Sequence, residues 1–191
     1  MPLSSSFRAT CFDKAMNSLP SRVPEAEIFV EISCPQWRQS LADPDALCRK
    51  AILAALEAVW KTRGAQSSVL QGESKAVYEI SLVLADDAFL RRLNRDFAGK
   101  DKATNVLAFV AGEDEGATSL GDVAIAYETV AREAVEHDKT VEDHLAHLVV
   151  HGMLHLLGYD HDSDASALTM ETQEVLILSH LGIGDPYDAA E

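Results

Sequence analysis

Cysteine is scarce in this sequence, and long apolar runs are missing altogether. Its three cysteines, Cys11, Cys34 and Cys48, form an odd set at no spacing typical of a metal or redox motif. This argues against a disulfide framework and favours a reducing compartment. The first 25 residues lack the roughly 7–15-residue apolar run of a secretory signal, and no stretch approaches the ~20 apolar residues of a membrane helix. We therefore expect a soluble, cytoplasmic protein with no membrane partner.

Positive charge is almost absent from the C-terminal part. Residues 110–191 carry Arg132 and Lys139 against 18 acidic residues, whereas residues 1–109 carry 14 basic and 13 acidic residues. A formal net charge of −15 argues against general nucleic-acid binding, because phosphates are held chiefly by Lys and Arg. One stretch is strongly basic, and its five basic residues are Arg91, Arg92, Arg95, Lys100 and Lys102. This stretch is the positive patch available to an anion.

The chain has the size of one domain. With 191 residues, of which 47% are apolar, it can bury a real core but is too short for two full domains. Residues 1–25 are rich in Ser and Pro and show no hydrophobic period, a composition that need not fold. We expect an N-terminal extension over residues 1–25 and a single domain over residues 26–191.

Hydrophobic patterning predicts a small α+β fold. Strands are expected at 27–33, 77–84, 105–110 and 121–126, and helices at about 43–63, 86–97, 127–136, 140–157 and 163–180. The last two strands are joined by a short acidic turn, which indicates a hairpin. This order has too few alternating units for a doubly wound sheet. We expect a mixed four-stranded sheet packed with about five helices.

The densest chemical signal is a histidine group near the end of the penultimate helix. His151 and His155 are four residues apart, so both rings leave the same helix face. Gly158 then ends the helix, and a left-handed glycine there can turn His161 back toward the pair. Three imidazoles leave a tetrahedral zinc ion with one open position, which is typical of a catalytic site. We expect one Zn²⁺ per chain, bound by His151, His155 and His161.

A simpler interpretation is that histidines on an apolar helix are ordinary core residues. Four of them, however, share one sector of this helix: His144, His147, His151 and His155. Buried polar groups without partners cost several kcal/mol, which metal coordination and hydrogen bonds to the ligands would offset. We expect His144 and His147 to line the cleft or hydrogen-bond to the ligands rather than bind metal themselves. Asp160 could orient an imidazole or could simply serve the turn.

The ligand spacing matches the pattern of the metzincin proteases, but one essential residue differs. Those proteases place a glutamate directly after the first histidine as the general base, and this chain has Gly152 there. A peptidase would need its base from elsewhere. The pattern therefore disfavours peptide hydrolysis, although a metzincin-like metalloprotease stays a third hypothesis.

Two blocks of sequence resemble the YbeY family of bacterial endoribonucleases and rRNA maturation factors. The first is His151-Gly-Met-Leu-His-Leu-Leu-Gly-Tyr-Asp-His161, and the second runs from Leu93 to Phe109. Gly121-Asp-Val is similar to the start of the family's fourth strand. The resemblance covers roughly residues 27–187. It depends most on the histidine motif, which combines the metzincin spacing with glycine in place of glutamate.

This resemblance implies a zinc-dependent, single-strand-specific endoribonuclease with an α+β fold and the three histidines as ligands. It would act in 3′-end maturation of small-subunit (16S) rRNA and in ribosome quality control. Its partners would be precursor rRNA and the small ribosomal subunit or its assembly factors, with no DNA expected. Residues 26–191 would then form one metal-dependent hydrolase domain.

Two positions depart from the family pattern. Ala98 stands where the family usually has an arginine tied to activity, and Ala103 where it usually has proline. Arg95, about one turn earlier, or Lys100 could supply the missing charge as a catalytic group. Three further residues could hold the RNA backbone, or could be a solvated helix face: Arg91, Arg92 and Lys102. The departure at Ala98 also motivates a second hypothesis, a ribosome-assembly factor whose zinc is mainly structural.

Overall fold

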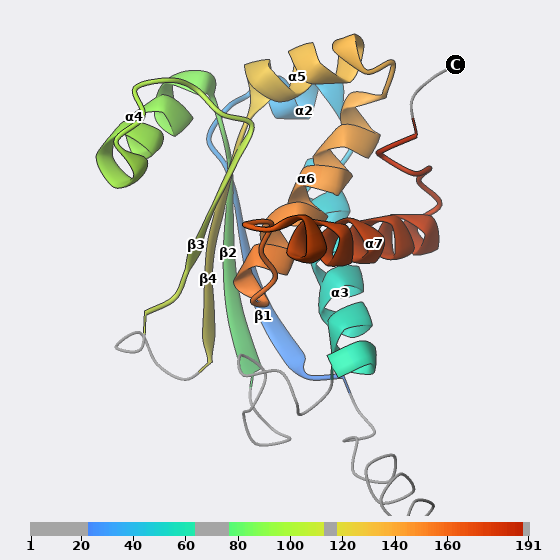
Figure 1. The fold of residues 1–191 in the computed structure, drawn as a ribbon. Helices are drawn as coiled ribbons and strands as arrows, with labels where there is room; N and C mark the ends of the chain where they lie inside the picture. The colour runs from blue at the N-terminus through green and yellow to red at the C-terminus, as the bar shows by residue number, and fades with distance from the viewer. Residues whose placement is uncertain (1–22, 64–76, 113–117, 189–191) are drawn as a thin grey trace, which may run out of the picture.

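Four strands and six helices make up the described part of the chain in our computed structural model, which covers residues 23–63, 77–112 and 118–188 (Figure 1). In chain order they are β1 (Glu25–Ile32), α2 (Gln36–Ser40), α3 (Pro44–Arg63), β2 (Val77–Ala85), α4 (Asp87–Ala98), β3 (Val106–Val110), β4 (Ser119–Ala126), α5 (Tyr127–Glu136), α6 (Val141–Leu156) and α7 (Asp164–Leu181). Residues 1–22 of the expected N-terminal extension lie outside the described residues.

The sheet is mixed, with strand order β1-β2-β4-β3. β1 pairs with β2 and β2 with β4 in parallel, while β3 pairs antiparallel with β4. The predicted α+β class, the four-stranded sheet and the hairpin are therefore confirmed. The additional helix is α2, a single turn after Pro35 that is too short to show a hydrophobic period, although its Trp37 is buried.

The two faces of the sheet are covered unequally. Helices α3 and α6 lie against one face, which we call the helical face, and α7 packs on these two helices (Figure 1). The opposite face, which we call the open face, carries α4 near one end. Along β2 the side chains alternate, so that Ile80 and Leu82 are buried while Glu79 and Ser81 are exposed. The main core thus lies on the helical face.

Helices α6 and α7, which position the site, begin and end within one residue of the predicted ranges. The Thr140 side chain caps α6 by accepting a hydrogen bond from the Asp143 backbone N–H, and Ser163 caps α7 in the same way. Beyond α6, Gly158 has φ +82°, the left-handed conformation predicted for it. The chain therefore turns sharply between His155 and His161.

Close packing of α6 on the sheet explains the glycine in the histidine motif. A Cβ added at Gly152 would lie 2.8 Å from Val123 Cγ1 and 3.1 Å from Val123 Cγ2. The first distance is shorter than real Cβ atoms show and the second is tighter than most, so glycine lets the helix approach β4 this closely without displacing Val123. None of the helices in the described ranges is long and apolar enough to cross a membrane.

Candidate metal centre

His151, His155 and His161 come together at the C-terminal end of α6. Each can direct one ring nitrogen to a common point, with these nitrogens all within 4.8 Å of one another. The rings of His151 and His155 lie 4.7 Å apart between centroids, and that of His161 lies 5.0 Å from His155. The turn at Gly158 thus brings the third ring to the pair, as the spacing predicts.

The hydrogen bonds of two rings leave their inner nitrogens as acceptors. His151 Nδ1 donates to Glu174 Oε1 (2.8 Å), and His155 Nδ1 donates to the Tyr159 backbone carbonyl (3.1 Å). In neutral rings the Nε2 atoms then carry lone pairs, and these two atoms face each other at 3.2 Å. Two converging lone pairs repel unless a cation lies between them. The donor set therefore fits a metal ion that prefers imidazole nitrogen.

The surroundings of His155 favour the neutral form of its ring. Burial lowers the pKa of His155, and the neighbouring His151 and His161 lower it further because a second positive charge would be repelled. A neutral imidazole is the form that binds metal. Burial and these neighbours therefore favour the form of His155 that can bind a metal ion.

Glu174 on α7 is a member of the candidate site that the sequence did not predict. Its carboxylate is 1% exposed and accepts hydrogen bonds from His151, from His147 Nε2 (2.8 Å) and from the Tyr187 hydroxyl. Burial alone would raise its pKa, but these three donors outweigh burial and lower the pKa to about 2. A signal was present, because Glu174 occupies the apolar stripe of α7 with Met170 and Ile177.

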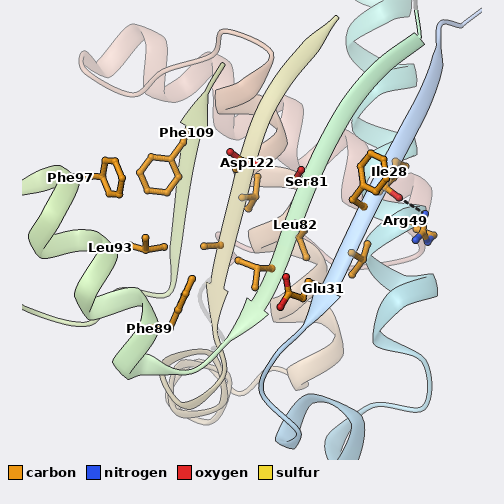
Figure 2. A pocket seen from close by; sticks show the side chains of 15 residues that line it. Ile28, Glu31, Arg49, Ser81, Leu82, Phe89, Leu93, Phe97, Phe109 and Asp122 are labelled. Atoms are coloured by element: carbon orange, nitrogen blue, oxygen red, sulfur yellow. Dashed lines mark hydrogen bonds between the residues drawn. The ribbon is translucent and has the colours of Figure 1, made fainter. Parts of the chain in front are cut away.

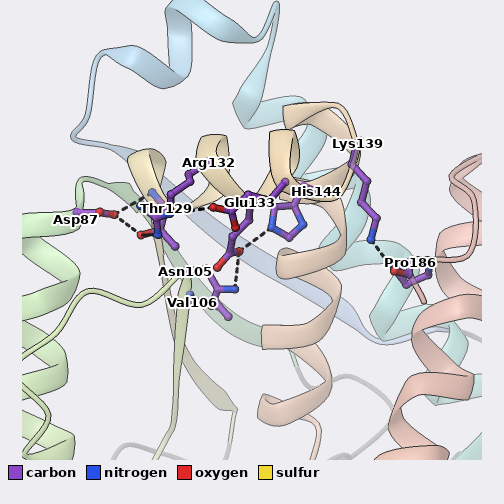
Figure 3. A network of polar contacts seen from close by, with 10 residues as sticks. Asp87, Asn105, Val106, Thr129, Arg132, Glu133, Lys139, His144 and Pro186 are labelled. Atoms are coloured by element: carbon purple, nitrogen blue, oxygen red, sulfur yellow. Dashed lines mark hydrogen bonds and ion pairs between the residues drawn. The ribbon is translucent and has the colours of Figure 1, made fainter. Parts of the chain in front are cut away.

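A second carboxylate holds His144, which lies one turn before His147 on α6 (Figure 3). Glu133 Oε2 accepts from His144 Nε2 (2.9 Å) and from Asn105 Nδ2 (2.9 Å). His144 is 6% exposed, and burial lowers its pKa despite the opposing effect of Glu133. Neither His144 nor His147 belongs to the three histidines that could hold a metal ion, which we call the metal-binding group, and His147 meets His151 of that group through Glu174.

The histidine group opens into a pocket of about 470 Å³. One wall is formed by β3, the edge strand of the sheet, and the floor by the end of α6 and the following turn. Asp160 lines this pocket, and its carboxylate accepts from the His161 backbone N–H (2.7 Å). Of the two roles considered for Asp160, the structure shows the one that stabilises the turn.

The predicted basic residues gather elsewhere, on α4 and the loop after it. A hollow of about 820 Å³ is lined by Arg91, Arg92, Arg95 and Lys102, together with Asp87 and Asp101. Arg91 is paired with Asp101 (2.7 Å) and Arg95 with Asp96 (2.9 Å), all of them largely exposed. Lys100 is also exposed. Neither Arg95 nor Lys100 lines the histidine pocket.

The open face carries a groove of about 770 Å³ (Figure 2). All four phenylalanines of the described residues line it: Phe29, Phe89, Phe97 and Phe109. Phe29 and Phe97 are 55% and 73% exposed. Glu31 and Asp122 also line the groove, and strand alternation places Glu27 and Glu79 on the same face. This groove combines aromatic and acidic side chains.

Comparison with known proteins connects these features to one family. The family model described as Endoribonuclease YbeY matches residues 38–182. A protein named Endoribonuclease YbeY from Paramagnetospirillum magneticum is 47% identical over 168 residues, which cover 84% of this chain and 95% of that protein. A protein of the same name from a Bradyrhizobium species is 45% identical, over 87% of this chain and 94% of its own length.

A solved structure agrees with the fold. The solution structure of TM1509 from Thermotoga maritima superposes with a TM-score of 0.50 at 22% identity, over 82% of this chain and 92% of that one. This likeness concerns the arrangement of the strands and helices.

The matched family region, residues 38–182, includes the histidine group, Glu174 and the basic hollow.

Proposed function

The chain belongs to the YbeY family of endoribonucleases and is therefore an RNA hydrolase, and from this premise we propose that its cleavage depends on zinc held by His151, His155 and His161. The observation that carries the proposal is the convergence of three ring nitrogens within 4.8 Å, with two of the rings fixed by hydrogen bonds at Nδ1. Three nitrogen donors suit a zinc ion that keeps one position open for chemistry.

The chain's own residues prepare the site for this ion. When bound, zinc would supply Lewis acidity that polarises a phosphoryl oxygen and activates water. His151 and His155 bind through Nε2 because their Nδ1 protons are held by Glu174 and Tyr159. β3 and the turn at Gly158 line the pocket into which the three histidines open.

The same geometry counts against a peptidase. In metzincins the residue after the first histidine supplies the general base. Here that position is Gly152, and its Cβ direction leads to Val123 in the sheet. A longer side chain there would enter the core rather than the pocket. The third hypothesis, a metzincin-like protease, therefore has no support from this site.

Within this proposal the substrate is precursor small-subunit (16S) rRNA, cut near its 3′ end in the cytoplasm. The basic hollow offers Arg91, Arg92 and Lys102 to the phosphate backbone. Arg95 lies in that hollow and Lys100 beside it, so both fit backbone binding better than contact with the reacting phosphate. The missing arginine at Ala98 then leaves the metal as the main source of positive charge at the bond that breaks.

We place the ribosomal partner on the open face. Its groove exposes Phe29 and Phe97 between acidic side chains, which suits a basic protein segment of the small subunit or of an assembly factor. This face is separate from the histidine pocket, so binding and cleavage can be altered independently. The assembly-factor hypothesis differs in one respect, because there the zinc would be structural.

Cleavage of a single-stranded RNA by the zinc-loaded protein tests the proposal. We expect cleavage by His155→Ala to fall to background, because the two histidine rings that remain would bind the ion too weakly. His180→Ala is the matched control, since His180 is an exposed histidine outside the metal-binding group and should leave the rate unchanged. Equal cleavage by both variants would show that the activity does not come from this centre.

Maturation of rRNA in cells separates the two remaining hypotheses. If zinc is structural only, a folded His155→Ala variant should still support rRNA maturation in cells. We expect instead that this variant binds ribosomes and fails to mature rRNA. The readout is the length of the 3′ end in cells that carry each variant.

A further inference from the structure

Glu174 is the one acidic side chain among the described residues that is buried. An ionised carboxylate away from water is costly unless donors surround it, so its position needs a reason. It projects from α7 toward α6, where it meets the histidine-bearing sector of that helix. Three donors compensate the charge, and one of them is a proposed metal ligand.

The two carboxylate oxygens have different tasks. Oε1 accepts from His151 Nδ1 alone, at 2.8 Å. Oε2 accepts from His147 Nε2 at 2.8 Å and from the Tyr187 hydroxyl. His147 and Tyr187 also contact each other, with ring centroids 5.8 Å apart. One oxygen therefore serves the ligand ring, while the other is fixed by two neighbours.

This arrangement settles which nitrogen of His151 carries the proton. An imidazole that donates from Nδ1 to a carboxylate presents its Nε2 lone pair on the opposite edge, and Nε2 is the atom that faces His155. A carboxylate behind a metal-bound histidine also makes the ring a better donor to the ion.

We infer that Glu174 is a positioning residue of the metal centre, which holds His151 in the tautomer and orientation that bind the ion, with His147 and Tyr187 fixing the carboxylate. The inference rests on the proposed zinc site. It extends that site to α7 and to the C-terminal segment, where Lys139 Nζ donates to the Pro186 carbonyl (2.6 Å) and helps to keep Tyr187 in place.

Helix α6 carries a second carboxylate-bound histidine, which supplies a matched control. Glu133 holds His144 as Glu174 holds His147 and His151, with a contact of 2.9 Å and Asn105 as its second donor. His144, however, is outside the metal-binding group. Loss of the Glu133 charge should therefore disturb a carboxylate–histidine pair without changing the metal ligands.

Zinc affinity, measured by competition with a chromophoric chelator, tests the inference on the full-length protein. We expect Glu174→Gln to bind zinc about 10- to 100-fold more weakly, as is usual when the partner of a metal-bound histidine is lost. Glu133→Gln should bind zinc like the wild type. Tyr187→Phe, which keeps the ring and removes one hydrogen bond from Oε2, should give a smaller loss than Glu174→Gln.

A second readout distinguishes positioning from general stability. Nitrogen-15 NMR of the metal-free protein should show the His151 proton on Nδ1 in the wild type and in Glu133→Gln, and a shift toward Nε2 in Glu174→Gln. Equal zinc affinities for the two Gln variants, or an unchanged His151 tautomer, would overturn the inference. Failure of the wild type itself to bind zinc would instead contradict the proposed function, and neither readout depends on RNA cleavage.

Discussion

The two faces of the sheet differ in the surroundings of their acidic side chains. On the helical face, the buried Glu174 is bound by three donors, and the neighbouring histidines all have defined partners or a place in the metal-binding group. On the open face, acidic side chains such as Glu27 and Glu79 extend into solvent beside exposed phenylalanines. Fixed geometry suits chemistry, whereas exposed and adaptable side chains suit recognition.

Both faces come from the same strands, so substitutions on one strand can compare them directly. Leu82 and Val83 are neighbours on β2, with Leu82 buried on the helical face and Val83 half-buried on the other. We expect Leu82→Ala to lower the free energy of unfolding by about 2–5 kcal/mol, because it leaves a cavity in the core. Val83→Ala should cost clearly less. Urea denaturation measures both, and equal losses would show that the faces are packed alike.

Zinc should stabilise the protein through the helical face alone. At a free zinc concentration about 100 times Kd, we expect the free energy of unfolding to rise by about 2.7 kcal/mol. His161→Ala should remove most of this gain, while the exposed position of His161 keeps the metal-free stability nearly unchanged. Denaturation with zinc and with a chelator provides the measurement. A full zinc effect in His161→Ala would exclude His161 as a ligand.

The contact of α6 with the sheet should be sensitive to one methyl group. We expect Gly152→Ala to lower the free energy of unfolding by about 1–3 kcal/mol, because the added Cβ overlaps the Val123 side chain. Gly184→Ala is the control, since a Cβ there meets nothing within 4 Å. Thermal or chemical unfolding compares the two. If Gly152→Ala were as stable as Gly184→Ala, the close approach of helix and strand would not be rigid.

The smallest expected effect is a pH dependence of the metal-free protein. Burial lowers the pKa of His144 in the folded state below its unfolded value of about 6.5. Below that pH the unfolded chain binds more protons at this residue, so stability falls as the pH drops, and above it this contribution is constant. We expect His144→Gln to show a shallower fall between about pH 8 and pH 5 in urea unfolding. An identical slope would contradict the assignment.

Much of this architecture was predictable, because it depends on local signals. Thr140, Ser163 and Gly158 mark helix ends through side-chain caps and backbone conformation, both of which are properties of a few adjacent residues. The convergence of His151, His155 and His161 was predictable for the same reason, since the three histidines lie within eleven residues.

The partners of the histidines were not predictable in this way. Glu133 and Glu174 lie 11 and 23 residues from the histidines they hold, on α5 and α7, and only the packing of those helices against α6 brings them together. From the sequence, Gly152 indicated only that the general base of the metzincins is absent at this position. Its contact with Val123 requires knowledge of how α6 crosses the sheet.

The eleven-residue span from His151 to His161 also has a consequence for the order of folding. Closing so short a loop costs much less chain entropy than pairing β1 with β2, whose partner residues Ile28 and Ile80 are 52 positions apart. A chain that has formed only the end of α6 and its glycine turn already holds all three histidines of the candidate metal centre. If they bind the proposed ion, binding would not require a completed sheet, and metal supply during synthesis would influence how quickly the domain matures.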